Sequence, residues 1–158
     1  MPTDNYTIYT GNAYRGQESD ASTPRVNGTG IAEADLEFGI ALERGNGTIE
    51  NGVKFSTGGN VFGVAIREAN HEADTRPSDG TTSYKTTNSV SIMREGYINV
   101  QNTGAAAMAI GVLANVVDTT GEFTGDAVAA GIVASTNVVA METIAAGEVG
   151  RVRIDIVA

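Results

Sequence analysis

Residues 62–100 read FGVAIREANHEADTRPSDGTTSYKTTNSVSIMREGYINV, and they carry the clearest structural pattern in the chain. An apolar run rich in β-branched residues, Val61–Ile66, ends in a charged and polar segment. A second run, Ser89–Met93, is followed by Glu95-Gly96 and then by Tyr97–Val100. Short apolar runs bounded by glycine and polar residues are typical of strands. We therefore predict a strand at each run, with a turn at Glu95-Gly96.

The segment between the two runs, Glu68–Thr87, is predicted to be a long polar loop. It contains Pro77 and the turn-forming pair Asp79-Gly80. Loops of this length inside a compact domain are usually functional or mobile. We therefore treat this loop as a candidate functional segment.

Outside this stretch the chain repeats the same strand-and-turn pattern. Phe38–Leu42 and Ile49–Phe55 read as strands, and Asn46-Gly47 and Asn51-Gly52 are strong signals of tight turns. In Val149–Val157, apolar and polar residues alternate, as in a strand with one buried face. We predict an all-β fold, a jelly-roll-like sandwich or barrel of about eight to ten short strands. One short helix is allowed at Glu33–Glu37 or at Ala105–Ala109.

Residues 1–30 differ in composition from the rest of the chain. They are polar and rich in turn-forming residues, which predicts an extended N-terminal arm followed by a single β-rich domain at residues 31–158. Tyr6–Thr10 could form one short strand within the arm. Large apolar side chains in an arm are costly to leave in water without a partner surface, and here these are Tyr6, Ile8, Tyr9 and Tyr14.

Composition excludes several classes of function. The chain has 158 residues, enough for one domain with a real core, and its net charge is −9. A surface this acidic repels phosphate backbones and anionic membranes, so we expect neither nucleic acid nor membrane as a partner. There are no cysteines, which rules out disulfides and thiolate chemistry.

The sequence does not support catalysis. His71 is the single histidine, and neither a second histidine nor a nucleophile elbow or phosphate-binding loop accompanies it. The carboxylates of Asp118, Glu122 and Asp126 lack the spacing of a calcium loop and read as a solvated turn. We therefore expect no enzymatic activity, no bound metal and no cofactor.

Residues 62–100 resemble a family of small capsid cement, or head decoration, proteins of tailed bacteriophages. The resemblance rests on hydrophobic spacing and a few polar positions, namely Gly63, Val64, Ala65, Arg67, His71, Glu72, Tyr84, Val90, Ser91, Ile92, Gly96, Ile98 and Val100. The segments 115–124 and 142–154 are also similar to these proteins, whereas the alanine-rich Gly104–Ile110 departs from their pattern.

This resemblance implies a structural protein that binds the outer surface of the capsid in the virion and clamps neighbouring major capsid proteins. It also implies a homo-oligomer, a trimer or alternatively a dimer, made in the host cytoplasm. We expect the arm to bind the capsid through Tyr6, Ile8, Tyr9, Tyr14 and Arg15. We expect the 68–87 loop and its flank to contribute subunit contacts through Arg67, His71, Glu72 and Arg76. The alternative is a tail- or fibre-associated β-domain that binds host glycan.

Overall fold

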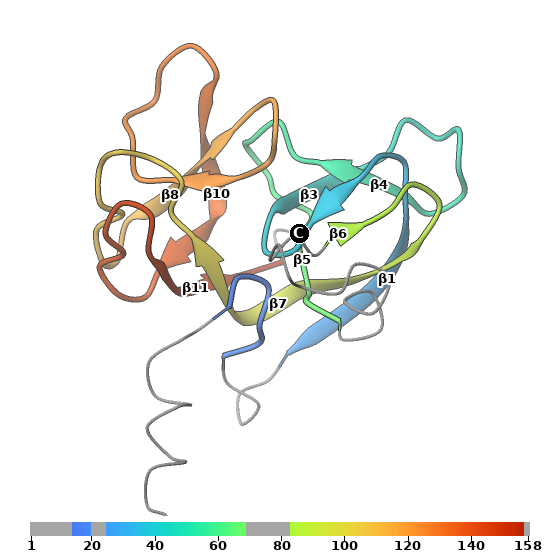
Figure 1. The fold of residues 1–158 in the computed structure, drawn as a ribbon, viewed down its shortest axis with the longest axis horizontal. Coiled ribbons are helices and arrows are strands. Elements are labelled where there is room, and N and C mark those ends of the chain that lie inside the picture. The colour runs from blue at the N-terminus through green and yellow to red at the C-terminus, as the bar shows by residue number, and fades with distance from the viewer. Residues whose placement is uncertain (1–13, 20–24, 69–82, 157–158) are drawn as a thin grey trace, which may run out of the picture.

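The computed structural model describes residues 14–19, 25–68 and 83–156. These residues form strands joined by turns, which confirms the all-β class (Figure 1). No helix is found within the described ranges, so neither of the two possible short helices is present, and Leu36–Glu37 is instead a strand. The strands are β1 (Val26–Ala32), β2 (Leu36–Glu37), β3 (Ala41–Arg44), β4 (Gly52–Phe55), β5 (Gly63–Ala65), β6 (Ser83–Tyr84), β7 (Ser89–Gln101), β8 (Leu113–Val117), β9 (Phe123–Thr124), β10 (Ile132–Ala140) and β11 (Val149–Ile154).

The first lobe is a small closed barrel. Its strands follow the order β1-β4-β3-β5-β7, and β1 pairs with β7 to close the ring. The β1–β4 pair is parallel, and the other four pairs are antiparallel. The β3–β4 connection contains Gly47 and Asn51 at positive φ, as expected for the two predicted Asn-Gly turns.

Large apolar side chains fill this first barrel, and the short pair β2–β6 adds two of them. Leu36 and Tyr84 pair across β2–β6, and both are completely buried. The rings of Tyr84 and Phe38 meet edge to face with centroids 5.1 Å apart. The Tyr84 hydroxyl donates a hydrogen bond of 2.5 Å to the carbonyl of Ile66, and burial raises the pKa of Tyr84. Tyr84, at the end of the predicted loop, is therefore a core residue.

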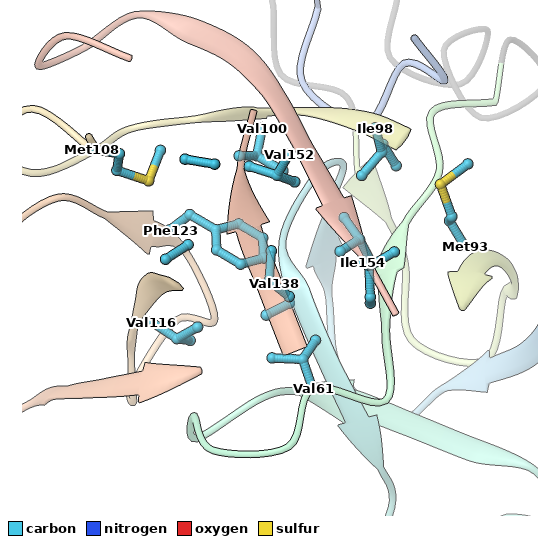
Figure 2. Close-up of a cluster of buried hydrophobic side chains, with 14 of the residues drawn as sticks. Val61, Met93, Ile98, Val100, Met108, Val116, Phe123, Val138, Val152 and Ile154 are labelled. Carbon is cyan, nitrogen blue, oxygen red and sulfur yellow. The ribbon is translucent and has the colours of Figure 1, made fainter. Parts of the chain in front are cut away.

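The second lobe is a five-stranded antiparallel sheet in the order β7-β11-β10-β8-β9. It curls back on itself, because Asn102, just after β7, forms a bridge with Phe123 in β9. The amide of Thr103 donates to the Phe123 carbonyl at 3.0 Å. Phe123 lies in the middle of the core of this lobe (Figure 2). That core continues toward the first barrel through Val61 and Met93.

Strand β7 belongs to both lobes. Its first half pairs with β1 and β5, and from Gly96 onward it pairs with β11 (Figure 1). The predicted turn at Glu95-Gly96 is therefore wrong. Gly96 has φ of 135°, a value that only glycine adopts easily, so the strand changes direction there without reversing. Val90 and Ile92 consequently pack in the first core, and Ile98 and Val100 in the second.

The residues that precede β1 are hydrogen-bonded to the body of the protein. The Gly16 amide donates to the Asn99 carbonyl at 2.7 Å, and the Asn99 amide donates to the Gln17 carbonyl at 2.9 Å. Residues 26–30, which the sequence analysis placed in the arm, are part of β1. Residues 1–13 lie outside the described residues, and for them the arm stays a prediction.

Candidate functional site

The structure brings together one residue from each of the two predicted functional segments. The guanidinium of Arg67 lies 4.3 Å from the centre of the Tyr14 ring. The Arg67 amide also donates to the Gly16 carbonyl at 2.7 Å. The cation–π contact with Arg67 covers only part of the Tyr14 ring. Tyr14 is 53% exposed, so the remaining surface of its side chain is accessible to a partner. We call Tyr14, Arg15 and Arg67 the arm base.

Arg15, also predicted to bind a partner, contacts carboxylates of its own chain. It forms ion pairs with Glu37 and, at 3.8 Å, with Glu122. Partial burial lowers the pKa of Arg15, and the charge of Glu122 opposes this shift. These contacts fix the start of the described chain against both lobes, and the role of Arg15 in partner binding stays a prediction.

Most of the other predicted site residues lie outside the described residues. They are Tyr6, Ile8, Tyr9, His71, Glu72 and Arg76. At the start of the predicted loop, Glu68 accepts a hydrogen bond from the hydroxyl of Ser91 in β7. Loop 68–87 therefore leaves the first barrel next to the arm base, because Glu68 directly follows Arg67.

The second lobe carries an exposed apolar surface that the sequence analysis did not identify. Ile110 is 63% exposed, Val112 is 54% exposed, and Leu113 at the start of β8 is also exposed. We call these three residues the apolar surface. Hydrogen bonds between Gly111 and Ala140 and between Ala140 and Val112 (2.7 and 3.0 Å) attach it to the end of β10. An indication was present in the sequence, since residues 96–117 contain no charged side chain.

Asn102 holds the chain that leads to this apolar surface. It is completely buried and uses both groups of its side-chain amide. Its Nδ2 donates to the carbonyls of Ala106 (2.8 Å) and Ile144 (3.0 Å). Its Oδ1 accepts from the amides of Gly104 (3.1 Å) and Gly125 (3.0 Å). This fully satisfied amide fixes the loop in one conformation.

Asp126 holds the same loop from outside. Its carboxylate accepts from the amides of Ala106 (2.8 Å) and Ala105 (3.0 Å). These backbone hydrogen bonds, that from Ala106 most of all, lower the pKa of Asp126. Two carboxylates of the predicted solvated turn therefore have different contacts. Asp126 binds the amides of loop 104–107, whereas Glu122 forms an ion pair with Arg15.

The described residues hold no cluster of metal-binding side chains. Within residues 14–19, 25–68 and 83–156, no three acidic or histidine side chains are grouped so that they could hold a metal ion. The same part of the chain contains no helix long and apolar enough to cross a membrane. What the described residues do present is the arm base with its exposed aromatic ring and the apolar surface, both on a β-scaffold.

The chain matches the model of a known protein family. A family model described as "Structural cement protein (E217 gp24/Pam3 gp6)" matches residues 1–155. The chain therefore belongs to the family of phage structural cement proteins, which confirms the resemblance found in the sequence.

The fold is shared with a viral structure. A chain in the solved structure "The capsid of Myoviridae Phage XM1" is 17% identical to this chain, with a TM-score of 0.71 and 98% of each chain covered. At this identity the similarity shows a common fold. A search of curated proteins found no match to this sequence.

Proposed function

We propose that this protein is a capsid cement: it binds the outer surface of a phage capsid and stabilises contacts between major capsid proteins. The observation that carries the proposal is the family match over residues 1–155. The fold shared with a chain of a phage capsid structure, and the two contact surfaces described above, support it. In this role the protein is a component of the virion and has no enzymatic activity.

The arm is the proposed capsid-binding element. Residues 1–13 would add a strand to a sheet edge of a neighbouring capsid protein and bury Tyr6, Ile8 and Tyr9. Tyr14 supports this arrangement, because its half-exposed ring stands where the described chain begins. The closed lobes support it too, since barrels leave few free sheet edges within the protein itself for the arm to pair with.

The apolar surface is the proposed contact between copies. Each copy carries a net charge of −9, so copies repel one another unless they meet through an uncharged area. Residues 96–117 and 127–141 contain no charged side chain, and their exposed large apolar side chains are Val128 and Val133 together with the three residues of the apolar surface, Ile110, Val112 and Leu113. We propose a trimer formed through this surface, with a dimer as the alternative.

Glycan binding is the weaker candidate. Sugar-binding sites commonly use exposed aromatic platforms, and the chain has no tryptophan. Among the described residues, Tyr14 is the one aromatic side chain in the exposed class. A single ring at the arm base favours a protein partner.

Co-sedimentation with capsids that lack this protein tests the proposal. We expect saturable binding, a higher temperature of capsid disruption, and a trimeric mass for the free protein by light scattering. Bovine serum albumin at the same concentration is the control for trapping in the pellet. A protein that stays in the supernatant at every concentration would refute the cement role.

A further inference from the structure

The first lobe contains a pocket in which two arginines face the same aromatic ring. The guanidinium of Arg94 lies 4.3 Å from the centre of the Phe62 ring, and that of Arg44 lies 4.6 Å from it. The two charges are therefore within about 9 Å of each other. They line a pocket of about 170 Å³ together with Phe62, Gly28, Thr29 and Asn51.

Neither arginine is neutralised by the described part of the chain. Arg15, Arg25, Lys54, Lys85 and Arg153 all form ion pairs with carboxylates. Arg44 and Arg94 form none within residues 14–19, 25–68 and 83–156, although acidic residues outnumber basic ones by 19 to 10. Each arginine has an acid next to it in sequence. Glu43, beside Arg44, is occupied by Lys54 (3.1 Å) and Thr57, and Glu95, beside Arg94, forms no ion pair with either arginine in the described structure.

The backbone directs Arg94 into this pocket. Asn27 pairs with Met93 and Val26 with Glu95, so Arg94 is the extra residue of a β-bulge on β7. Bulges re-aim a side chain and are over-represented beside functional sites. The Nε of Arg94 is buried and has no hydrogen-bond partner in the described structure, an arrangement that costs free energy unless a ligand supplies an acceptor.

We propose that the Arg44–Phe62–Arg94 pocket binds a carboxylate side chain of the major capsid protein. Guanidinium groups held in place over a ring are pre-organised to donate paired hydrogen bonds to a carboxylate, and two of them provide more charge than one acid needs. The inference rests on the proposed function and names a second contact with the same partner.

The position of the pocket selects this partner over a second copy. Gly28 and Thr29 of β1 line both this pocket and a neighbouring one, which Glu18 and Glu68 line on the other side. Glu68 directly follows Arg67 of the arm base. The arginine pocket is thus close to the surface where the arm leaves the protein. It lies on the first lobe, whereas the proposed contact between copies lies on the second.

The test is co-sedimentation of full-length variants with capsids that lack the protein. We expect Arg44→Gln combined with Arg94→Gln to weaken binding about tenfold or more, and Arg44→Lys combined with Arg94→Lys to recover only part of it. Arg151→Gln is the matched control, because Arg151 also has no ion pair among the described residues but lies beside Tyr97 in the second lobe. Its binding should not change. Thermal unfolding of each variant checks that the fold is intact.

The outcomes separate this inference from the cement role. Wild-type-like binding by the Gln double variant would overturn the inference and leave the cement role standing. If the Gln double variant loses its oligomeric mass but still binds capsids, the carboxylate belongs to a second copy of this protein, and the inference is overturned as well. If the wild-type protein ignores capsids, the cement role fails, and titration of the protein with glutarate then tests the pocket directly. Saturable shifts of the Arg44 and Arg94 Nε–H resonances would support a carboxylate site, and unchanged resonances would refute it.

Discussion

Asn137 and Val61, 76 residues apart in sequence, are joined by two hydrogen bonds that imitate the pairing of two strands. The side-chain Oδ1 of Asn137 accepts from the Val61 amide at 3.0 Å, and its Nδ2 donates to the Val61 carbonyl at 2.8 Å. Nδ2 also donates to the Asp155 carbonyl at 2.9 Å. Asn137 lies in β10 of the second lobe, whereas Val61 lies two residues before β5 of the first. This buried amide is therefore one of the contacts that hold the two lobes together, beside the backbone hydrogen bonds of Gly59 with Ala134 and Thr136.

Replacing Asn137 by alanine should destabilise the protein by about 1–3 kcal/mol, because the buried amide and carbonyl of Val61 lose their partner. The free energy of unfolding is measured by chemical denaturation, with circular dichroism as the signal. Thr136→Ala, an exposed change at the adjacent residue, should stay within about 0.5 kcal/mol of wild type. Equal stability of the two variants would show that Asn137 does not hold the lobes together.

Replacing Gly96 by alanine should also destabilise the fold, by about 1–3 kcal/mol, because an L-residue is strained at a φ of 135°. The added Cβ would lie 3.2 Å from Cβ of Arg25 and 3.3 Å from the Met93 sulfur. Gly147→Ala is the control, since Gly147 has φ of 76° and no atom within 4 Å of an added Cβ. A smaller loss of stability for Gly96→Ala than for Gly147→Ala in thermal denaturation would contradict the role of Gly96 in bending β7.

Deleting residues 2–13 should leave a folded protein that no longer binds capsids. The hydrogen bonds of Gly16 and Gln17 to Asn99 remain, so we expect an unfolding midpoint close to wild type. Deleting residues 2–19 removes those bonds, so the midpoint should fall. Unchanged capsid binding after the shorter deletion would place the capsid contact elsewhere on the molecule.

Replacing Ile110 and Val112 by serine should shift the protein from trimer to monomer. Each side chain would lose the free energy of burial against another copy, which corresponds to a weakening of association of about ten- to hundredfold. Light scattering across a concentration series measures the change. Val26→Ser, at an exposed apolar residue of the first lobe, should leave the mass unaltered. A trimeric double variant would remove the apolar surface from the interface between copies.

The loop at 104–107 should loosen in acid. The pKa of Asp126 is lower in the folded protein than the value of about 4 in an unfolded chain, so its contribution to stability is present above pH 4. That contribution is lost as the pH falls through the folded pKa. Hydrogen exchange at the amides of Ala105 and Ala106 should therefore accelerate at low pH, beyond the intrinsic pH dependence of exchange. In Asp126→Asn this acceleration should vanish, and its persistence would argue against the carboxylate as its cause.

Local sequence patterns were enough to predict the fold class and the last strand. Alternation in Val149–Val157 predicts β11, because one of its faces packs against a core and the other meets water. The same reasoning failed at Glu95-Gly96. A glycine after a polar residue is a usual turn signal. Here the residues up to Glu95 pair with β1 and those from Gly96 onward pair with β11, and this pairing keeps the chain extended.

The candidate site was harder to predict, because its residues meet only in three dimensions. Tyr14 and Arg67 are far apart in the sequence, and no local pattern indicates that their side chains touch. The same holds for Arg44, Phe62 and Arg94. One indication of the apolar surface was present in the sequence, the uncharged segment 96–117, but strands that are buried in the core have the same composition. Only the exposed fractions of Ile110 and Val112 separate the two.

The sharing of β7 by both lobes has a mechanical consequence. A force that pulls the lobes apart along this strand is carried by covalent bonds of the backbone, since Ser89–Gln101 passes from one barrel into the other without a flexible linker. The hydrogen bonds of β1 and β11 then lie across the direction of pull and are loaded together, in shear, rather than opened one after another. The strength of a shell fastened by such a molecule would then be set by non-covalent contacts, those within each lobe and those with the capsid, rather than by the connection between the lobes.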